Sequence, residues 1–243
     1  MELNVIAETN HFIVVQKPAG IPSQGDKTED LDMLTLIKQY LKEKYQKPGN
    51  VYLGLVHRLD RPVSGLMVFA KTSKAAARLS QQVREHQLEK GYLVVCDGKL
   101  EPEKGIMEDY LLKDERKNTS KVVSKETKNS KFAKLEYEVL RYREDNDISL
   151  VKVKLHTGRH HQIRVQFSSR GNSLYGDQRY GTRGKQKNIA LFAYHLSFLD
   201  PITKQRLYYE ILPEKKRNLE YIRWSSFMEL IRKKCKNMLM KSC

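Results

Sequence analysis

The sequence is poor in cysteine and in long apolar runs, and each shortage excludes a class of protein. Three cysteines in 243 residues, none in a Cys-x-x-Cys pair, argue against a disulfide framework and against a zinc ribbon. No stretch reaches the ~18 to 20 consecutive apolar residues of a membrane-spanning helix. The first residues also lack the basic start and apolar core of a secretory signal. We therefore expect a cytoplasmic protein whose thiols carry no chemistry.

Acidic residues are scarce relative to basic ones. The 29 Asp and Glu residues are outnumbered by 45 Lys and Arg, which gives a formal net charge of +16. An excess of this size attracts polyanions such as RNA and DNA, and also anionic membrane surfaces. The length favours one large domain, which we expect over residues 1–216, followed by a basic amphipathic helix over 217–243. We expect the apolar stripe of that helix to pack on the core and its charge to face RNA, not a membrane.

Apolar residues at alternate positions or at helical spacing outline the secondary structure. Helical spacing predicts helices over 32–45 and 73–89, and Asp30 or Asp32 is the expected cap of the first. Residues 113–134, rich in Lys, Ser, Thr and Asn, are expected to form an exposed loop or a mobile hairpin, either solvated or gripping RNA. Apolar runs and alternation predict strands over 12–16, 66–70, 92–96, 134–140, 149–155, 190–198 and 205–212.

One carboxylate stands out because of its surroundings in the sequence. Asp60 lies between Arg58 and Arg61, just ahead of a Ser-Gly turn and an apolar strand. Neighbouring positive charge keeps a carboxylate ionised, and an adjacent core strand would hold it in place. A surface ion pair that contributes no more than about 1 kcal/mol is the structural alternative. The placement suits a single catalytic acid better than a solvated loop.

Three short motifs resemble those of one family. His-Arg-Leu-Asp at 57–60, followed by Ser-Gly-Leu at 64–66, resembles the signature of the RluA-like RNA pseudouridine synthases. Thr-Gly-Arg-His-His-Gln-Ile-Arg at 157–164 resembles the second hallmark of that family, and Lys-Pro-Ala-Gly at 17–20 resembles its first motif. The resemblance implies an α+β fold, a single domain whose mixed, mainly antiparallel sheet is flanked by helices. It also implies isomerisation of uridine to pseudouridine in ribosomal or transfer RNA, with no cofactor and no metal.

The resemblance assigns the chemistry to three residues. Asp60 matches the catalytic carboxylate, which acts as nucleophile or as general base toward the sugar. Arg164 matches the basic partner, and a bidentate guanidinium would fix that carboxylate in orientation. Tyr92 matches the active-site tyrosine, whose ring stacks on the base and whose hydroxyl helps remove the proton from C5. On strand preference alone, Tyr92 would be a core residue of a β-strand.

Five more residues are expected near the substrate. Arg58 matches an arginine that enters the space left when the uridine leaves its stack, and a simple phosphate contact is the alternative. The turn at 157–159 is expected to deliver Gln162 and Arg164 to the site. The expected residues on the substrate side are Arg58, His57, Leu196, Arg159 and Gln162, with His57 as a hydrogen-bonded structural group and Leu196 as an apolar wall beneath the uracil.

Three histidines admit a different class of site. The spacing of His156 and His160 would suit two zinc ligands on a helix, and His161 adds a third imidazole. The segment is predicted as strand and turn, however, and no nearby Cys or suitably placed Glu completes a zinc set. A metal-dependent nuclease is therefore one rival to the synthase. The others are a catalytically idle RNA-binding or ribosome-assembly protein and a membrane-surface protein, and no obligate protein partner is indicated.

Overall fold

The computed structural model describes residues 3–25, 30–181 and 189–213. The predicted basic helix over 217–243 and the predicted domain boundary at 216 lie outside these residues and stay predictions. Cys235 and Cys243 also lie outside them, whereas Cys96 is buried in the core. Within the described residues, no helix is long and apolar enough to cross a membrane.

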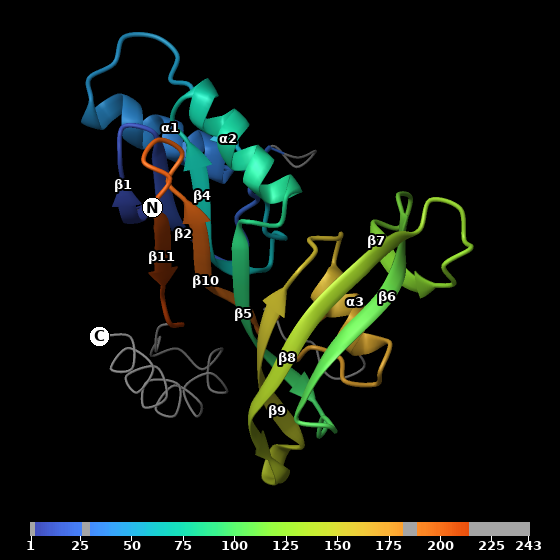
Figure 1. Cartoon of the computed structure of the whole chain (residues 1–243). Coiled ribbons are helices and arrows are strands. Elements are labelled where there is room, and N and C mark those ends of the chain that lie inside the picture. Colours follow the sequence, from blue (N-terminus) through green and yellow to red (C-terminus); the bar gives the residue numbers. More distant parts are fainter. Residues whose placement is uncertain (1–2, 26–29, 182–188, 214–243) are drawn as a thin grey trace.

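An 11-stranded mixed sheet organises the described chain (Figure 1). The strand order is β1-β2-β4-β10-β5-β9-β8-β6-β7, with β11 paired to β10 and β3 paired to β4. All the pairs within the described ranges are antiparallel except β4 with β10, so the predicted mixed, mainly antiparallel sheet is confirmed. The strands are β1 (Asn4–Glu8), β2 (Phe12–Lys17), β3 (Gly54–Leu55), β4 (Ser64–Ala70), β5 (Glu89–Asp97), β6 (Lys104–Asp114), β7 (Thr119–Val123), β8 (Lys131–Arg143), β9 (Ile148–Leu155), β10 (Leu191–Leu199) and β11 (Arg206–Glu210).

The helices begin at polar caps that the sequence only partly predicts. Asp32 caps α1 (Met33–Lys44) by accepting hydrogen bonds from two backbone N–H groups of its first turn, as predicted. Thr72, not Ser73, caps α2 (Ser73–Arg84). This helix ends earlier than predicted because His86 adopts a φ of 57° and turns the chain into β5. The remaining helices are α3 (Gln162–Ser168) and a 3₁₀ turn (Glu144–Asn146).

The two longer helices cover opposite faces of β2 and β4. Ile13 and Val15 of β2 belong to the apolar cluster that includes the buried side of α1. The alternate residues Phe12 and Val14 belong to the cluster that includes Leu79 of α2. Burial of each such side chain stabilises the fold by roughly 1.5–3 kcal/mol. Strands β2 and β4 therefore form a rigid, doubly covered platform, and the loop that carries Asp60 leads directly into β4.

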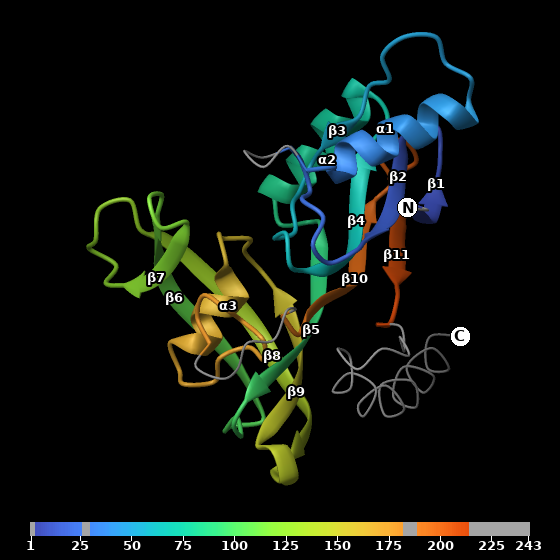
Figure 2. The ribbon, with the colours of Figure 1, turned by 180° about the vertical axis from the view of Figure 1, so that it is seen from behind.

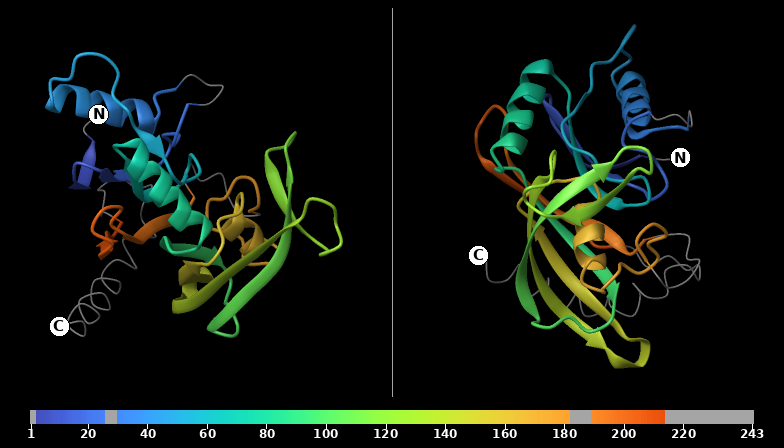
Figure 3. Two further views of the ribbon diagram at one scale, coloured as in Figure 1. Left: turned by 45° about the horizontal axis from the view of Figure 1, so that its top comes forward. Right: turned by 90° about the vertical axis from the view of Figure 1, so that its right-hand side faces the viewer.

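The two halves of the sheet are covered by different helices. Helices α1 and α2 lie with β1, β2 and β4, whereas α3 lies with β6, β7 and β8, and β5 runs between the two groups (Figure 2). The same arrangement is visible from two further directions (Figure 3). The motifs at 57–60 and 157–164, about a hundred residues apart in the chain, therefore belong to different halves of the sheet and meet where the two halves join.

The basic segment 113–134 is a hairpin and not a loop. It contains the end of β6, all of β7 and the start of β8, and β6 pairs antiparallel with both strands. Few side chains of its strands face inward. The small buried cluster beneath it consists of Leu111 of β6, Ala133 of β8 and Val165 of α3. The outward positions are polar, so an alternating strand pattern is hard to recognise in the sequence.

Residues 156–161, which include the start of the second hallmark motif, form bends and a turn after β9, as predicted, whereas no element was predicted for the residues that follow. Residues 162–168 form α3, which is only seven residues long. His161 precedes it with a φ of 53°. Most of the helix is buried, including polar residues, so it lacks the one-sided apolar pattern that predicts a helix. For that reason, the sequence pattern did not predict this helix.

Candidate active site

A cavity of about 1240 Å³ opens between the two halves. Its walls come from the loop before β4, the start of β5, the turn before α3, the first turns of α3 and the loop after it. The predicted site residues that line it are His57, Arg58, Asp60, Tyr92, Arg159, Gln162 and Arg164. Seven of the eight predicted site residues therefore line one cavity, although their motifs are distant in the chain.

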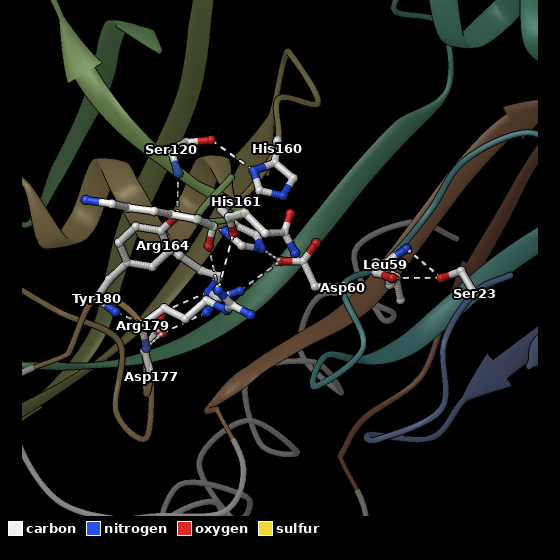
Figure 4. Close-up of polar contacts among 12 residues, drawn as sticks. Ser23, Leu59, Asp60, Ser120, His160, His161, Arg164, Asp177, Arg179 and Tyr180 are labelled. Atoms are coloured by element: carbon white, nitrogen blue, oxygen red, sulfur yellow. Dashed lines mark hydrogen bonds and ion pairs between the residues drawn. The ribbon is translucent and has the colours of Figure 1, made fainter. Parts of the chain in front are cut away.

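Asp60 sits at the centre of this cavity on an anchored loop. Its carbonyl oxygen accepts a hydrogen bond from the Val63 N–H at 2.9 Å, which closes a tight turn into β4. The Ser23 hydroxyl binds both the N–H and the carbonyl of Leu59, at 3.1 and 2.7 Å (Figure 4). The Asp60 side chain is 31% exposed. The backbone is therefore held while the carboxylate stays open to the cavity.

The nearest cation to the Asp60 carboxylate is Arg164, on α3. Arg164 Nη1 lies 3.2 Å from Asp60 Oδ2. The expected neighbour Arg61 instead pairs with Asp30 and donates to the Gly20 carbonyl. Positive charge thus reaches Asp60 from the distant motif and not from the adjacent arginine.

Arg164 is itself held by a second carboxylate. Its Nε and Nη2 donate to the two oxygens of Asp177 at 2.8 and 2.7 Å, a bidentate pair. Burial opposes the charge on Arg164, but the hydrogen bonds to Asp177 and Asp60 outweigh burial and raise its pKa. The Asp177 side chain has no exposed surface and also accepts from the N–H groups of Arg179 and Tyr180. Sequence analysis missed Asp177, because nothing in a Gly-Asp pair reveals a distant arginine.

Tyr92 belongs both to the core and to the cavity. It is 6% exposed, packs in the main apolar cluster and lines the cavity wall. Burial, and then the negative charge of Asp60, raise its pKa. The phenol is therefore neutral at physiological pH. The two interpretations of this residue are compatible, because a strand tyrosine can pack along its ring edge and present a face to a ligand.

Lys90, two residues before Tyr92 on β5, is a cation without a counter-ion. It lines the cavity, and its Nζ lies 3.1 Å from the position that a side-chain carbon on Gly158 would occupy. Within the described residues it makes no hydrogen bond or ion pair with a carboxylate, and burial lowers its pKa. An unpaired cation on a cavity wall favours an anionic ligand.

His57 and Gln162 have structural tasks at the cavity wall. His57 Nε2 accepts the N–H of Val68 on β4 at 3.1 Å, and burial lowers its pKa to about 3, so the ring is neutral. The Gln162 amide oxygen accepts from the Thr157 hydroxyl and the Arg159 N–H, and its NH₂ group donates to the Lys134 carbonyl and to Gln166. The hydrogen-bonding capacity of that amide is used within the protein.

The two arginines at the rim differ in how firmly they are held. Arg58 is exposed. Arg159 is half-buried and donates from Nε to the Phe132 carbonyl at 2.7 Å. Arg58 is therefore free to reorient toward a ligand, whereas Arg159 also joins the turn to β8.

The prediction for Leu196 was wrong. It is 1% exposed and packs in the cluster that contains Leu79 and Leu88, beneath α2. It does not line the cavity. Apolar residues that do line the cavity include Leu155, Ile189 and Leu191. Strand β10 carries a register irregularity between Ala193 and His195, which simple alternation along the strand does not predict.

The three histidines of the second motif separate in the structure. His156 pairs with Glu136 on β8 at 2.8 Å, while His160 and His161 stack on each other with ring centroids 3.8 Å apart. His161 Nε2 lies 3.5 Å from Asp60 Oδ2, and burial lowers the pKa of His161 to about 4. Across the described ranges, no group of three or more His, Cys, Asp or Glu side chains is placed to hold a metal ion. His161 is thus a neutral neighbour of the carboxylate that sequence analysis had considered only as a metal ligand.

The arrangement suits proton transfer or nucleophilic attack by one carboxylate. Asp60 has an open face, and a buried arginine and a neutral imidazole both lie near its Oδ2 atom. A neutral phenol, that of Tyr92, lies on the same cavity wall. Charged nucleophiles and bases react best where fixed dipoles replace water around them.

Comparisons of the sequence with known proteins give one family. The family model described as RNA pseudouridylate synthase matches residues 11–169. An uncharacterized RNA pseudouridine synthase of Aquifex aeolicus is 34% identical over 222 residues, covering 86% of this chain and 69% of that protein. The ribosomal large subunit pseudouridine synthase D of Zymomonas mobilis is 32% identical over 219 residues, covering 84% and 67%.

Comparison of the structure with solved structures gives the same fold. Human RNA pseudouridylate synthase domain containing 4 superposes with a TM-score of 0.73 at 20% identity, covering 87% of this chain and 89% of that one. Human RNA pseudouridylate synthase domain containing 1 gives 0.70 at 23% identity, covering 88% and 84%. At these identities the likeness concerns the fold alone.

Proposed function

The chain belongs to the RNA pseudouridine synthase family, whose members are isomerases, and on that premise we propose that it isomerises uridines of ribosomal RNA with Asp60 as its single catalytic carboxylate. The reaction breaks the bond from N1 of the base to the sugar carbon C1′ and forms a bond from C5 to C1′. One proton leaves C5 and one is gained at N1. No electrons are exchanged with a second reactant, so one carboxylate and one proton acceptor are sufficient.

The observation that carries the proposal is the half-open carboxylate of Asp60. Its backbone is anchored through Leu59, and one of its oxygens is held by Arg164, but its side chain remains 31% exposed to the cavity. Both possible routes, attack on C1′ and removal of a sugar proton, need an ionised carboxylate held in a defined orientation. The geometry supports either route equally.

Tyr92 and Arg164 have separate tasks in the proposed reaction. Burial keeps the Tyr92 phenol protonated, so it supports stacking on the base and hydrogen bonding to it more than deprotonation of C5 by a phenolate. Arg164 orients Asp60, because Asp177 holds the guanidinium at two points. In this proposal Arg164 acts on the reaction through Asp60.

The charge of the cavity supports an RNA substrate. Arg58, Lys90, Lys113 and Arg159 line it. A uridine in structured RNA must leave its stack to reach a carboxylate inside a cavity, at a cost of a few kcal/mol, and phosphate contacts offset part of that cost. In this proposal the exposed Arg58 enters the gap that the uridine leaves in the stack.

The proposed choice of ribosomal over transfer RNA rests on the relatives. The protein of Zymomonas mobilis and one of Buchnera aphidicola, which is 28% identical, are named ribosomal large subunit pseudouridine synthases D and C. Recognition of structured RNA depends on shape and on loop contacts. The cavity residues by themselves do not distinguish the two classes of RNA.

Release of tritium from C5-labelled uridine tests this function, since C5 must lose its hydrogen to form the new bond. Purified wild-type protein is incubated with unmodified ribosomal and transfer RNA pools labelled at C5, beside Asp60→Asn and the surface control Asp145→Asn. We expect release by wild type and Asp145→Asn from ribosomal RNA and none by Asp60→Asn. RNA that is bound without tritium release would instead support the idle RNA-binding alternative.

A further inference from the structure

A chain of contacts runs from the backbone of β7 to Asp60. The peptide N–H of Ser120 donates to the Tyr180 hydroxyl, with 2.7 Å between the heavy atoms. The Tyr180 oxygen lies 2.8 Å from His161 Nδ1. His161 Nε2 lies 3.5 Å from Asp60 Oδ2. Figure 4 shows these side chains in sequence between the hairpin and the carboxylate.

The direction of these hydrogen bonds follows from what each group can do. A peptide N–H can only donate, so the Tyr180 oxygen is the acceptor from Ser120. The Tyr180 proton is then available to the only other polar atom in this chain of contacts, His161 Nδ1. Because burial lowers the pKa of His161 to about 4, the ring carries one proton at neutral pH. With Nδ1 accepting from Tyr180, that proton would lie on Nε2, the nitrogen that faces Asp60.

We propose that His161 and Tyr180 are positioning residues for the reaction, which present an Nε2–H to Asp60 and whose tautomer is set by the backbone of β7. The Oδ2 atom of Asp60 would then accept from two donors, Arg164 and His161. This inference rests on the proposed catalytic role of Asp60. Contacts of this length in a free enzyme commonly shorten when substrate is bound.

Ser120 of β7 also contacts the second histidine of this pair, His160. The Ser120 hydroxyl lies 2.9 Å from His160 Nδ1, and the ring of His160 stacks on that of His161. Nearby, Arg179 donates to the carbonyl of Lys117, in the turn of the hairpin, at 3.2 Å. The hairpin also contributes Lys113 to the cavity wall. RNA that binds the hairpin is therefore linked to the orientation of Asp60 through a few rigid contacts.

Other charged groups surround His161 and bear on its protonation. Asp60 favours the charged ring, whereas Arg164, Arg179 and His160 oppose it. Burial has a larger effect than any of them and also opposes it. Loss of the Tyr180 hydroxyl leaves these charges in place and removes the partner that selects the tautomer, together with the acceptor of the Ser120 N–H.

Removal of one hydroxyl tests the proposal. Tyr180→Phe should lower kcat at least about tenfold while KM changes by less than about twofold, because an interaction that acts through the reacting carboxylate affects the chemical step. Tyr142→Phe is the matched control, since its hydroxyl bonds Asp147 far from the cavity. At His161, Gln keeps an N–H donor at the same reach and should retain more kcat than Met, which has a similar shape. Equal kcat for the Gln and Met variants, or an unchanged kcat for Tyr180→Phe, would overturn the proposal.

The tautomer can be measured without RNA. Nitrogen-15 NMR of histidine-labelled protein distinguishes an Nε2–H ring from an Nδ1–H ring, and the His161 signals are identified by their loss in His161→Gln. We expect Nε2–H in wild type near pH 7 and a mixture of tautomers in Tyr180→Phe. An Nδ1–H or doubly protonated ring in wild type would contradict the inference. Because this readout needs no turnover, absence of tritium release from every RNA would refute the proposed function without deciding the tautomer.

Discussion

Two loops bring a carboxylate to Arg164, and they do so in opposite ways. In the loop after α3, Asp177 has no exposed side-chain surface and accepts two hydrogen bonds from Arg164 and two from backbone N–H groups. In the loop before β4, Asp60 is 31% exposed and has one contact with Arg164, at 3.2 Å. One carboxylate is saturated, and the other keeps lone pairs free.

The difference separates a structural carboxylate from a reactive one. A carboxylate has about four lone-pair sites, and Asp177, which is buried and accepts four hydrogen bonds, has none open to a substrate. Asp177 therefore stabilises the arginine, and the arginine orients Asp60. Asp177 fixes Arg164 in place, and Arg164 contacts Asp60, whose carboxylate stays open to the cavity.

Replacing each aspartate by asparagine gives the sharpest test of this comparison and the largest expected effects. Asp60→Asn should lower turnover by about a thousandfold or more, since an amide is neither a nucleophile nor a base, and should leave stability and RNA binding nearly unchanged. Asp177→Asn should lower the free energy of unfolding by about 3 to 5 kcal/mol, because it leaves a buried arginine without its main partner. Tritium release and urea unfolding measure the two effects.

The two variants control for each other. Turnover near the wild-type rate in Asp60→Asn would remove the catalytic assignment. A stable Asp177→Asn protein with normal unfolding would show that Asp60 alone compensates the charge of Arg164. Either result would contradict the assignment of Asp177 as the structural carboxylate and Asp60 as the reactive one.

Arg164→Lys breaks the sharing of one guanidinium between the two carboxylates. An ammonium group cannot bind Asp177 at two points and still reach Asp60, since it lacks the planar fork. We expect turnover to fall by roughly ten- to a hundredfold, with a smaller loss of stability than in Asp177→Asn. Arg170→Lys is the matched control, because Arg170 also binds both oxygens of one aspartate, Asp109, near the surface. Equal losses in the two lysine variants would point to a general effect on folding.

The loop of Asp60 should respond to acid because it contains His57. Burial lowers the pKa of His57 from 6.5 to about 3. Between these values the unfolded chain binds a proton that the folded chain does not, so stability falls as the pH drops below 6.5. At about pH 5 the loss from His57 is about 2 kcal/mol. His161, with a pKa lowered to about 4, adds its own loss over a narrower range.

Urea unfolding near pH 7.5 and near pH 5 measures this loss. In His57→Gln the difference in unfolding free energy between the two pH values should shrink, because the group that titrates is gone. The contribution of His161 remains in both proteins and serves as an internal reference. An identical pH dependence in the variant and in wild type would contradict the assignment to His57.

The smallest expected effect extends the comparison from carboxylates to cations. Arg164 is fully paired, whereas Lys90 has no counter-ion among the residues that the structure describes. Lys90→Met should weaken RNA binding a few-fold and reduce the salt dependence of binding by about one phosphate contact. It should also leave the protein as stable as before or more stable, since a partly buried charge is removed. Lys74→Met, at an exposed position of α2, is the control and should change neither quantity.

Secondary structure could be predicted where one face of an element is apolar and the other polar. The stripe of Ile37 and Leu41 predicted α1, and the alternation in β8 and β9 predicted an antiparallel pair that the structure confirms. The same logic failed for α3, which is buried nearly all round, and for β7, whose side chains are mostly solvated. A periodic pattern of apolar residues arises only where one side of an element faces the core and the other side faces water.

The sequence by itself predicted that Asp60, Tyr92 and Arg164 share one site, because short motifs around them can be recognised from their residue types, and all three line the cavity. It also determined a strongly basic protein that attracts polyanions. Only the tertiary structure decided that Asp177 holds Arg164, that His161 faces Asp60, and that Leu196 lies beneath α2. These outcomes depend on contacts between segments far apart in the chain, and on burial and donor direction at each contact, which no local pattern of residues encodes.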